Sequence, residues 1–409
     1  MSKVKPTLVN PFRPGAGHMP PYLAGRVRET DEFKVLLGQD VILKNLVLTG
    51  LRGLGKTVLL ETFKPMAIQA GWLWAGTDLS ETSSISEEHL STRLLADLSV
   101  VASTFLVSSE KSQAGFANDK ASPAQPVLSY QALKSLYDGL PGLVSDKIKG
   151  VLEFIWPHVQ STGRKGIIFA YDEAQNLADH EAKDQYPLSL LLDVFQSLQR
   201  KGIRFMLVLT GLPTLFPKLV EARRFAERMF RVISLNPLDQ EETTKAIRVP
   251  IETSKWAGFP DSLVATIWRT TKGYPYFIQY FCREVFDVWV QVMEQGLESF
   301  PPIPAHEIMR KLDSDFFAGR WARATDRQRE LLSVVACLST ADSEFTVQEI
   351  VDHASNYSLD KPFGNSHVSQ LLNSLLEAGL IFKNRHGKYS FAAPLMADFI
   401  KRQIDTIYV

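Results

Sequence analysis

Short apolar segments alternate with longer segments of helical periodicity through the first 240 residues of the chain. Five continuous apolar segments predict buried strands, at residues 43–50, 71–79, 166–173, 204–211 and 231–238. Amphipathic patterns lie between them, for example at residues 187–202, just before the fourth predicted strand. This alternation predicts an α/β fold whose parallel sheet is covered by helices on both faces.

The last ninety residues follow a different pattern. Two capping boxes, each a Thr followed three residues later by Gln or Glu, precede amphipathic helices at residues 325 and 346. A third helix is expected at 366–379, and two strand-like runs follow it on either side of the sequence Asn-Arg-His-Gly. Three helices and a hairpin predict a winged helix-turn-helix.

These patterns divide the chain into successive parts. A Pro-rich stretch after residue 295 predicts a linker, because prolines cannot continue a helix. A stretch rich in Ser, Ala, Gln and Pro, residues 108–127, predicts a surface insertion. The expected parts are an N-terminal arm (1–21), an α/β core (22–238), a helical region (239–295), a linker (296–315) and the winged helix (316–409).

Composition narrows the functional classes. The chain of 409 residues is long enough for two or three domains. Lys and Arg total 45, as do Asp and Glu, so no net charge indicates nucleic acid or an anionic membrane. The two cysteines, Cys282 and Cys337, exclude a disulfide framework and a thiolate metal cluster. We expect a reducing cytoplasm and no membrane partner, because no apolar run has the length of a signal peptide or a membrane span.

The loop after the first predicted strand carries the clearest chemistry. Its residues Gly50-x-x-x-x-Gly55-Lys56-Thr57 fit the phosphate-binding loop, in which backbone N–H groups and a helix N-terminus face phosphate oxygens. Lys56 would neutralise the β- and γ-phosphates, and Thr57 would bind Mg²⁺. The alternative is a glycine-rich turn that binds nothing. The predicted nucleotide-binding residues of this loop are Gly50, Leu51, Arg52, Gly53, Leu54, Gly55, Lys56, Thr57 and Val58.

Polar residues end the third and fourth predicted strands, at the edge where parallel sheets bind ligands. Asp172 would hold Mg²⁺ through water, and Glu173 would orient the attacking water, since phosphoryl transfer is catalysed by placement and charge neutralisation. Two solvated carboxylates at a turn are the alternative. Thr210 would hydrogen-bond the γ-phosphate or the attacking water, or would equally serve as a strand-end or helix-capping residue.

The order of these motifs resembles that of AAA+ ATPases. The similarity extends from about residue 22 to about residue 403 and is greatest to the origin-recognition (Orc1/Cdc6-like) branch and the related STAND and MNS signalling ATPases. The resemblance implies a P-loop NTPase core of five parallel strands in the order 5-1-4-3-2, followed by a helical lid and a winged helix. It also implies ATP as the nucleotide, since no guanine-reading Asn-Lys-x-Asp motif is present.

The resemblance also implies contacts to adenine. Tyr22, Leu23 and Arg26 lie in a segment similar to the one that lies against adenine in these ATPases. The alternative is an ordinary N-terminal arm that leads into a helix. Pro275, in a Gly-x-Pro break, resembles the proline that packs near adenine in STAND and MNS proteins. The break stands where origin-recognition ATPases usually carry an arginine that contacts the phosphates and is called the second sensor. The presence of this arginine in the chain is therefore in doubt.

An arginine before the fifth predicted strand resembles the finger that reaches a neighbouring subunit's γ-phosphate. Arg228 is the first candidate, with Arg231 and Arg224 as rivals, and its role would require a homo-oligomer. A surface arginine or a salt-bridge partner is the alternative.

The predicted winged helix could bind either duplex DNA or a protein. Duplex DNA would meet polar residues of the third helix and basic residues of the hairpin. Residues 320–409 nevertheless hold ten Lys or Arg and ten Asp or Glu, without the basic surplus of most DNA-binding modules, and winged helices also dock proteins. The candidate DNA contacts are Asn365, His367, Ser369, Gln370, Asn373, Lys383, Arg385, His386 and Lys388.

Two functions remain from the sequence. In the first, a Mg²⁺-dependent ATPase uses its nucleotide state to control self-association and DNA engagement. In the second, the chain is a nucleotide-gated signalling switch whose winged helix docks a protein partner. A small-molecule kinase is disfavoured, because the helical lid and winged helix leave no obvious acceptor site.

Overall fold

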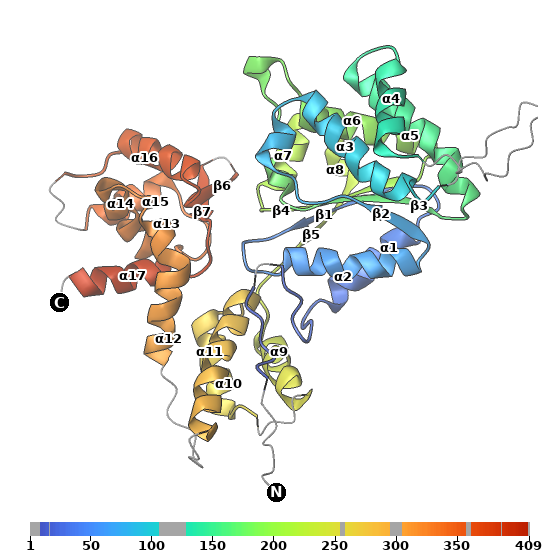
Figure 1. Ribbon diagram of the computed structural model, residues 1–409. Coiled ribbons are helices and arrows are strands. Elements are labelled where there is room, and N and C mark those ends of the chain that lie inside the picture. Colours follow the sequence, from blue (N-terminus) through green and yellow to red (C-terminus); the bar gives the residue numbers. More distant parts are fainter. Residues whose placement is uncertain are drawn as a thin grey trace, which may run out of the picture. The chain divides into compact units, whose positions relative to one another are not determined.

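The computed structural model describes residues 9–15, 17–105, 128–253, 258–294, 305–356, 361–385 and 387–407 (Figure 1). The predicted insertion and His386 lie outside these residues. The chain divides into two compact units: unit 1 comprises residues 1–26, 50–58 and 235–409, and unit 2 comprises residues 27–49 and 59–234. No helix of the described residues has the length and apolar character needed to cross a membrane.

Unit 2 contains the sheet that the sequence predicts. Each of the five predicted apolar segments forms a strand, and every neighbouring pair is parallel, in the order β2-β3-β4-β1-β5. This is the order that the resemblance implied, so the prediction is confirmed. The strands are β1 (Asn45–Thr49), β2 (Trp72–Ala75), β3 (Gly166–Tyr171), β4 (Phe205–Gly211) and β5 (Phe230–Ser234).

Helices cover both faces of this sheet (Figure 1). α1 and α2 lie on one face, where Phe33 and Phe63 stack with ring centroids 4.1 Å apart. α3, α5 and α6 lie on the other face, so the continuous apolar strands are buried on both sides. The helices are α1 (Val27–Leu37), α2 (Lys56–Gln69), α3 (Glu87–Ala102), α4 (Tyr130–Gly139), α5 (Val144–Ser161), α6 (Pro187–Arg200), α7 (Leu215–Ala222) and α8 (Ala226–Met229), with 3₁₀ turns η1 (Glu81–Ser84), η2 (Ala174–Asn176) and η3 (Glu181–Lys183).

One buried side chain fixes the start of β1. Asn45 is fully buried, and its amide nitrogen donates to Gln199 Oε1 at 3.2 Å and to the Met229 carbonyl at 3.3 Å. Its amide oxygen accepts from Gln199 Nε2 at 2.9 Å and from the Leu207 N–H at 2.7 Å. Because every hydrogen-bonding group of the amide is satisfied, the polar residue joins β1 to its neighbours without a desolvation penalty.

Unit 1 is helical apart from one hairpin. α9, α10 and α11 form the helical region predicted at 239–295. Helix α12 begins at Ala305, within the stretch predicted as a linker. The elements are α9 (Gln240–Thr253), α10 (Asp261–Thr271), α11 (Pro275–Glu294), α12 (Ala305–Leu312), the π-helix η4 (Asp313–Ala318), α13 (Gly319–Trp321), α14 (Asp326–Ala336), α15 (Val347–Ala354), α16 (Asn365–Glu377), β6 (Ile381–Arg385), β7 (Lys388–Phe391) and α17 (Met396–Ile407).

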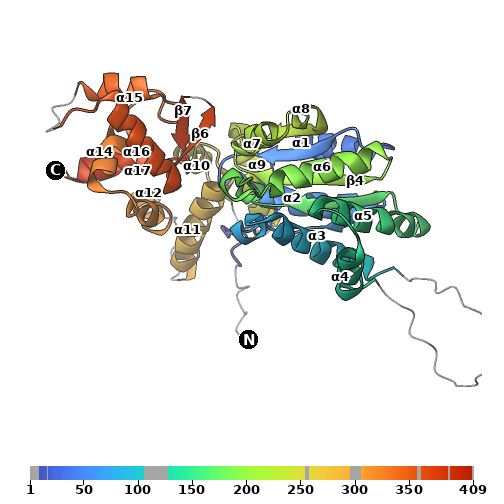
Figure 2. The same cartoon turned by 90° about the horizontal axis from the view of Figure 1, so that it is seen from above.

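The C-terminal elements are those that a winged helix needs. Both predicted capping boxes form, at the starts of α14 and α15. α16 is followed by Gly379 with a left-handed φ of 68°, and β6 pairs antiparallel with β7. A bridge between Phe345 and Tyr389 adds a further short pairing beside the hairpin. Figure 2 shows α14 to α17 gathered with the hairpin.

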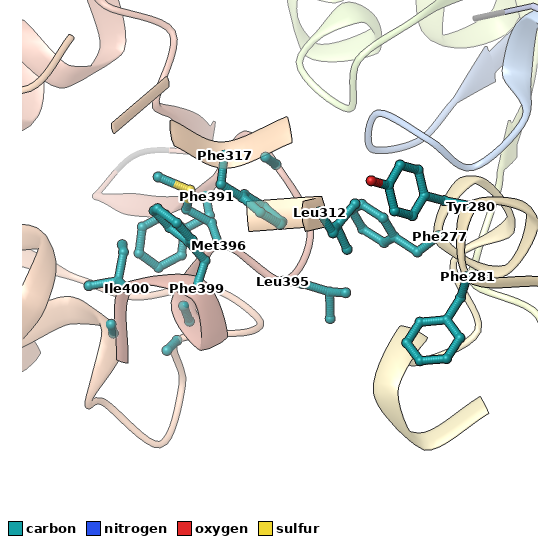
Figure 3. Close-up of a cluster of buried hydrophobic side chains, with 14 of the residues drawn as sticks. Phe277, Tyr280, Phe281, Leu312, Phe317, Phe391, Leu395, Met396, Phe399 and Ile400 are labelled. Carbon is teal, nitrogen blue, oxygen red and sulfur yellow. The ribbon is translucent and has the colours of Figure 1, made fainter. Parts of the chain in front are cut away.

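An aromatic cluster joins α11 to the C-terminal elements within unit 1 (Figure 3). The Phe277 ring lies 5.1 Å from that of Phe316 and 6.0 Å from that of Phe317, centroid to centroid. Phe317 in turn stacks on Phe399 of α17 at 5.1 Å. The burial of these rings makes α11 and the C-terminal elements one apolar core.

Candidate functional site

The loop after β1 has the backbone that its glycines allow. Gly53 and Gly55 have φ values of 82° and 84°, a left-handed conformation that residues with a Cβ rarely adopt. No described atom lies within 4 Å of the position that a Cβ on Gly55 would take. The helix α2 starts at the next residue, Lys56, and its first turn contains no acidic side chain. A glycine-rich backbone therefore leads into a helix N-terminus, as anion binding requires.

Lys56 folds back over this loop. The residue is buried and retains 8% of its accessible surface. The Nζ ammonium donates to the carbonyl of Gly50 at 3.0 Å and to that of Leu51 at 3.1 Å. The positive charge is thus held at the loop, where the sequence predicted it.

Arg26, the residue before α1, supports the loop. The residue is buried, and its Nη2 donates to the Leu54 carbonyl at 3.1 Å and to the Asn236 carbonyl at 3.0 Å. The guanidinium therefore fixes the loop backbone, a role that the sequence did not predict. The predicted contact of Arg26 with adenine stays a prediction, as do those of Tyr22 and Leu23, which are half-buried.

The start of α11 also meets the loop. Pro275 is the first residue of this helix, where a missing N–H costs no hydrogen bond. The N–H of the next residue, Tyr276, donates to the Gly53 carbonyl at 3.1 Å. The Gly-x-Pro break thus lies beside the predicted phosphate loop, and Tyr276 is a contact that sequence reasoning missed, although it follows the proline directly.

A second arginine lies in the electrostatic field of the loop. Arg320 stacks over the Phe316 ring at 4.1 Å, and the Phe316 and Tyr276 ring centroids are 5.3 Å apart. Burial lowers the pKa of Arg320, and the positive charges of Arg52 and Arg323 lower it further. Arg320 therefore packs on the same aromatic cluster as Tyr276, whose N–H binds the loop, a neighbour that the sequence did not predict.

The predicted acidic pair lies at the end of β3, in unit 2. Asp172 is buried, and its Oδ1 accepts the N–H of Glu173 at 2.8 Å. Glu173 has a left-handed φ of 51°, which is uncommon for a residue with a side chain and typical of strained functional positions. The Gln175 Nε2 donates to Glu173 Oε2. The carboxylate of Glu173 is therefore held by a neighbour that sequence reasoning missed.

Thr210 lies near the carboxyl end of the adjacent strand, β4. It is fully buried, and its hydroxyl has no hydrogen-bond partner among the described residues. A buried hydroxyl without a partner carries a free-energy penalty of about 1–3 kcal/mol. The predicted contact of Thr210 with the γ-phosphate or the attacking water stays a prediction.

Four arginines precede or begin β5, and they differ in their partners. Arg223 pairs with Asp193 at 2.7 Å, and Arg231 donates from Nε to Glu32 at 2.8 Å. Arg224 and Arg228 are exposed, and no side-chain partner is seen for either among the described residues. The rival Arg231 is thus engaged within its own unit, while Arg228 and Arg224 remain candidates for a contact in trans.

Most of the predicted DNA contacts are exposed. The side chains of Asn365, His367, Gln370 and Asn373 on α16 are exposed, as is Lys383 in β6. Ser369 and Lys388 are half-buried, and the side chain of Arg385 lies outside the described part of the chain.

The fold can now be compared with known proteins. The Aeropyrum pernix ORC2 protein in its ADP form is 14% identical and matches over 96% of both chains with a TM-score of 0.52. The same protein in ADPNP–ADP complexes is also 14% identical over 96% of both chains, with a TM-score of 0.50. The chain has the AAA+ fold of the origin-recognition proteins. The predicted fold class is therefore confirmed.

Three further comparisons add little to this AAA+ fold. Residues 314–400 match a family described as a domain of unknown function (DUF8462). No curated protein matches the chain. The Aeropyrum pernix ORC1 protein in complex with DNA is 16% identical over 94% of both chains, but its TM-score of 0.43 is too low to support an argument.

Proposed function

We propose that this AAA+ protein is a Mg²⁺-dependent ATPase whose nucleotide state controls self-association and DNA engagement. The observation that carries the proposal is the loop: two left-handed glycines, open space at Gly55 and the Lys56 charge over the loop carbonyls, all at the start of α2. This arrangement fits a polyphosphate. ATP is favoured because the ORC2 structures of the same fold are described as nucleotide complexes.

The residues divide the chemistry between the carboxyl ends of β1 and β3, which belong to one parallel sheet. Lys56 would neutralise phosphate oxygens, and Glu173 would orient the attacking water. Thr57 and Asp172 would hold Mg²⁺ through a hydroxyl and a carboxylate oxygen, ligands that this ion accepts. When bound, the ion would neutralise charge on the phosphates. The unpartnered Thr210 hydroxyl would contact the γ-phosphate or the water.

One short segment supports coupling between the nucleotide and the C-terminal region. Tyr276 donates to the loop carbonyl of Gly53, and four residues earlier Lys272 pairs with Asp342 and Asp398 at 2.7 Å each. These two acids belong to the C-terminal elements. A change in the loop backbone on binding nucleotide would therefore reach the winged helix through a few residues at the start of α11.

Two variants test the proposed reaction. Lys56→Ala should abolish binding of a fluorescent ATP analogue, because the positive charge at the loop is lost. Glu173→Gln should keep binding and stop phosphate release, because the water is no longer activated. Arg164→Ala, on an exposed residue that precedes β3 at the opposite end of the strand from Glu173, serves as the control that should leave both unchanged. Brisk turnover by Glu173→Gln would refute the role of that carboxylate.

The DNA proposal and the signalling-switch alternative separate in one experiment. The rate of ATP hydrolysis is measured with and without duplex DNA over a series of protein concentrations. Stimulation by DNA, with a rate per chain that climbs with concentration, supports DNA binding and an arginine acting in trans. Slow turnover that is indifferent to DNA favours a nucleotide-gated switch whose winged helix docks a protein. The exposed polar face of α16 is compatible with either partner.

A further inference from the structure

We infer that Gln175 is a positioning residue that holds Glu173 for ATP hydrolysis and ties it to the end of β4. The inference rests on the ATPase activity proposed above. It starts from the side-chain amide of Gln175, which bonds two groups at once: Nε2 donates to Glu173 Oε2, and Oε1 accepts the N–H of Leu212 at 3.1 Å.

The two partners fix the orientation of this amide. A carboxylate oxygen only accepts, so the amide nitrogen must face Glu173; a backbone N–H only donates, so the amide oxygen must face Leu212. Glutamine supplies both a donor and an acceptor, at the reach that this turn requires. Glutamate and leucine are close to it in size, but glutamate lacks the donor and leucine lacks both groups.

The backbone of Gln175 is anchored as well. Its carbonyl accepts from Lys218 Nζ of α7 at 2.8 Å, and burial lowers the pKa of that lysine. The side chain also lies close to Gly211, where an added Cβ would be 2.6 Å from Gln175 Oε1. Glycine at the end of β4 is thus what allows the amide to approach so closely.

These contacts connect Thr210, which would contact the γ-phosphate or the attacking water, with Glu173, which would orient that water. Thr210, Gly211 and Leu212 follow one another at the end of β4, so the turn that holds the Gln175 amide adjoins the unpartnered Thr210 hydroxyl. Glu173 itself has a left-handed backbone, and its carboxylate depends on neighbours for a defined direction. Misplacing a catalytic group by about 1 Å can slow a reaction about 100-fold.

The test compares Gln175→Leu with the wild type and with Asn176→Ala in the full-length protein. Asn176 is the matched control, since it belongs to the same 3₁₀ turn but donates its amide to the Leu79 carbonyl at 2.9 Å, away from Glu173. Gln175→Leu should lower kcat for ATP at least tenfold, with the KM and the affinity for a fluorescent ATP analogue within twofold of wild type. Asn176→Ala should keep kcat within twofold.

Two further variants separate positioning from folding. Gln175→Glu keeps the size and an acceptor of the side chain but loses the donor to Glu173 Oε2, so it should lower kcat as Gln175→Leu does, with the affinity for the fluorescent ATP analogue within twofold of wild type. Gly211→Ala keeps Gln175 but displaces its amide oxygen, and it should also lower kcat. An unchanged kcat in Gln175→Leu or in Gln175→Glu would overturn the inference while leaving the ATPase proposal intact. A wild-type protein that binds no ATP would overturn both.

Discussion

Gly273 offers a direct test of the segment that connects the loop with the C-terminal elements. It has a left-handed φ of 77°, and its carbonyl accepts the N–H of Leu238 at 2.8 Å. A Cβ at this position would lie 1.9 Å from the Leu238 carbonyl oxygen and 3.0 Å from its carbon. Both contacts are with backbone atoms, which cannot move aside as the end of a flexible side chain can. Gly273→Ala must therefore displace the chain before α11.

The magnitude follows from three contributions. The left-handed conformation costs an alanine about 1–2 kcal/mol, of which about 0.4–1 is recovered because alanine restricts the unfolded chain. Loss of the hydrogen bond to Leu238 adds about 1 kcal/mol, and the forced backbone shift about 1–3 kcal/mol. The free energy of unfolding should therefore fall by about 4 kcal/mol, among the larger effects of single substitutions.

Gly379→Ala is the matched control. Gly379 lies in the same unit with a φ of 68°, and no described atom lies within 4 Å of the position of its Cβ. Gly379→Ala introduces the same backbone strain as Gly273→Ala but no steric overlap with a neighbouring atom, so it should lower the free energy of unfolding by about 1 kcal/mol. Urea denaturation of both variants measures the difference. If the two variants unfold within about 0.5 kcal/mol of each other, the close approach at Leu238 does not constrain the chain, and the reasoning is refuted.

Three further substitutions test other contacts. Lys272→Met removes the ion pairs with Asp342 and Asp398 and should destabilise by about 1 kcal/mol, given their partial exposure. Burial lowers the pKa of Lys272, but the two acids outweigh this effect and raise the pKa above 10.5. The difference in the free energy of unfolding between wild type and Lys272→Met, measured by urea denaturation, should thus persist at pH 7 to 9 and vanish as the pH rises beyond that folded-state pKa. A difference that does not change with pH would exclude the ion pairs as its source. Arg26→Ala removes the donor to the buried Leu54 carbonyl and to the Asn236 carbonyl, and it should lower both the free energy of unfolding, by about 2 kcal/mol, and the affinity for ATP; retention of full affinity would show that the loop holds its own shape. Arg228→Ala should leave ATP binding unchanged and reduce only the concentration-dependent part of the hydrolysis rate.

The sequence was sufficient where the determining interactions are local. Continuous apolar runs located all five strands, and capping boxes located two C-terminal helices, because burial on both faces and helix capping depend on neighbouring residues. The phosphate loop was recognisable because its backbone requires glycine at fixed spacing. The strand order came only from the resemblance, since no local pattern records which strands are neighbours.

The contacts that hold the site residues in place could not be predicted, because they join residues far apart in the chain. Arg26 joins carbonyls 28 and 210 residues away, and Arg231 pairs with Glu32 across 199 residues. No pattern around either arginine distinguishes such partners from solvent or nucleotide. Gln175 is different: it lies two residues after Glu173, but its value as a bridge depends on Leu212, 37 residues later. The candidate site was thus predictable as a set of reactive groups and unpredictable in the contacts that hold them.

The segment that departed from the origin-recognition pattern is also the one with contacts on two sides. Lys272 binds two acids of the C-terminal elements, and Tyr276 binds the loop, with Gly273 between them in a conformation that an alanine could not share. A ligand shifts a conformational equilibrium only by the difference in its affinity for the two states. Nucleotide binding at the loop therefore controls the C-terminal region only if it changes the Gly53 carbonyl that Tyr276 holds. Hydrogen exchange at the Tyr276 N–H, with and without nucleotide, reports on that one bond.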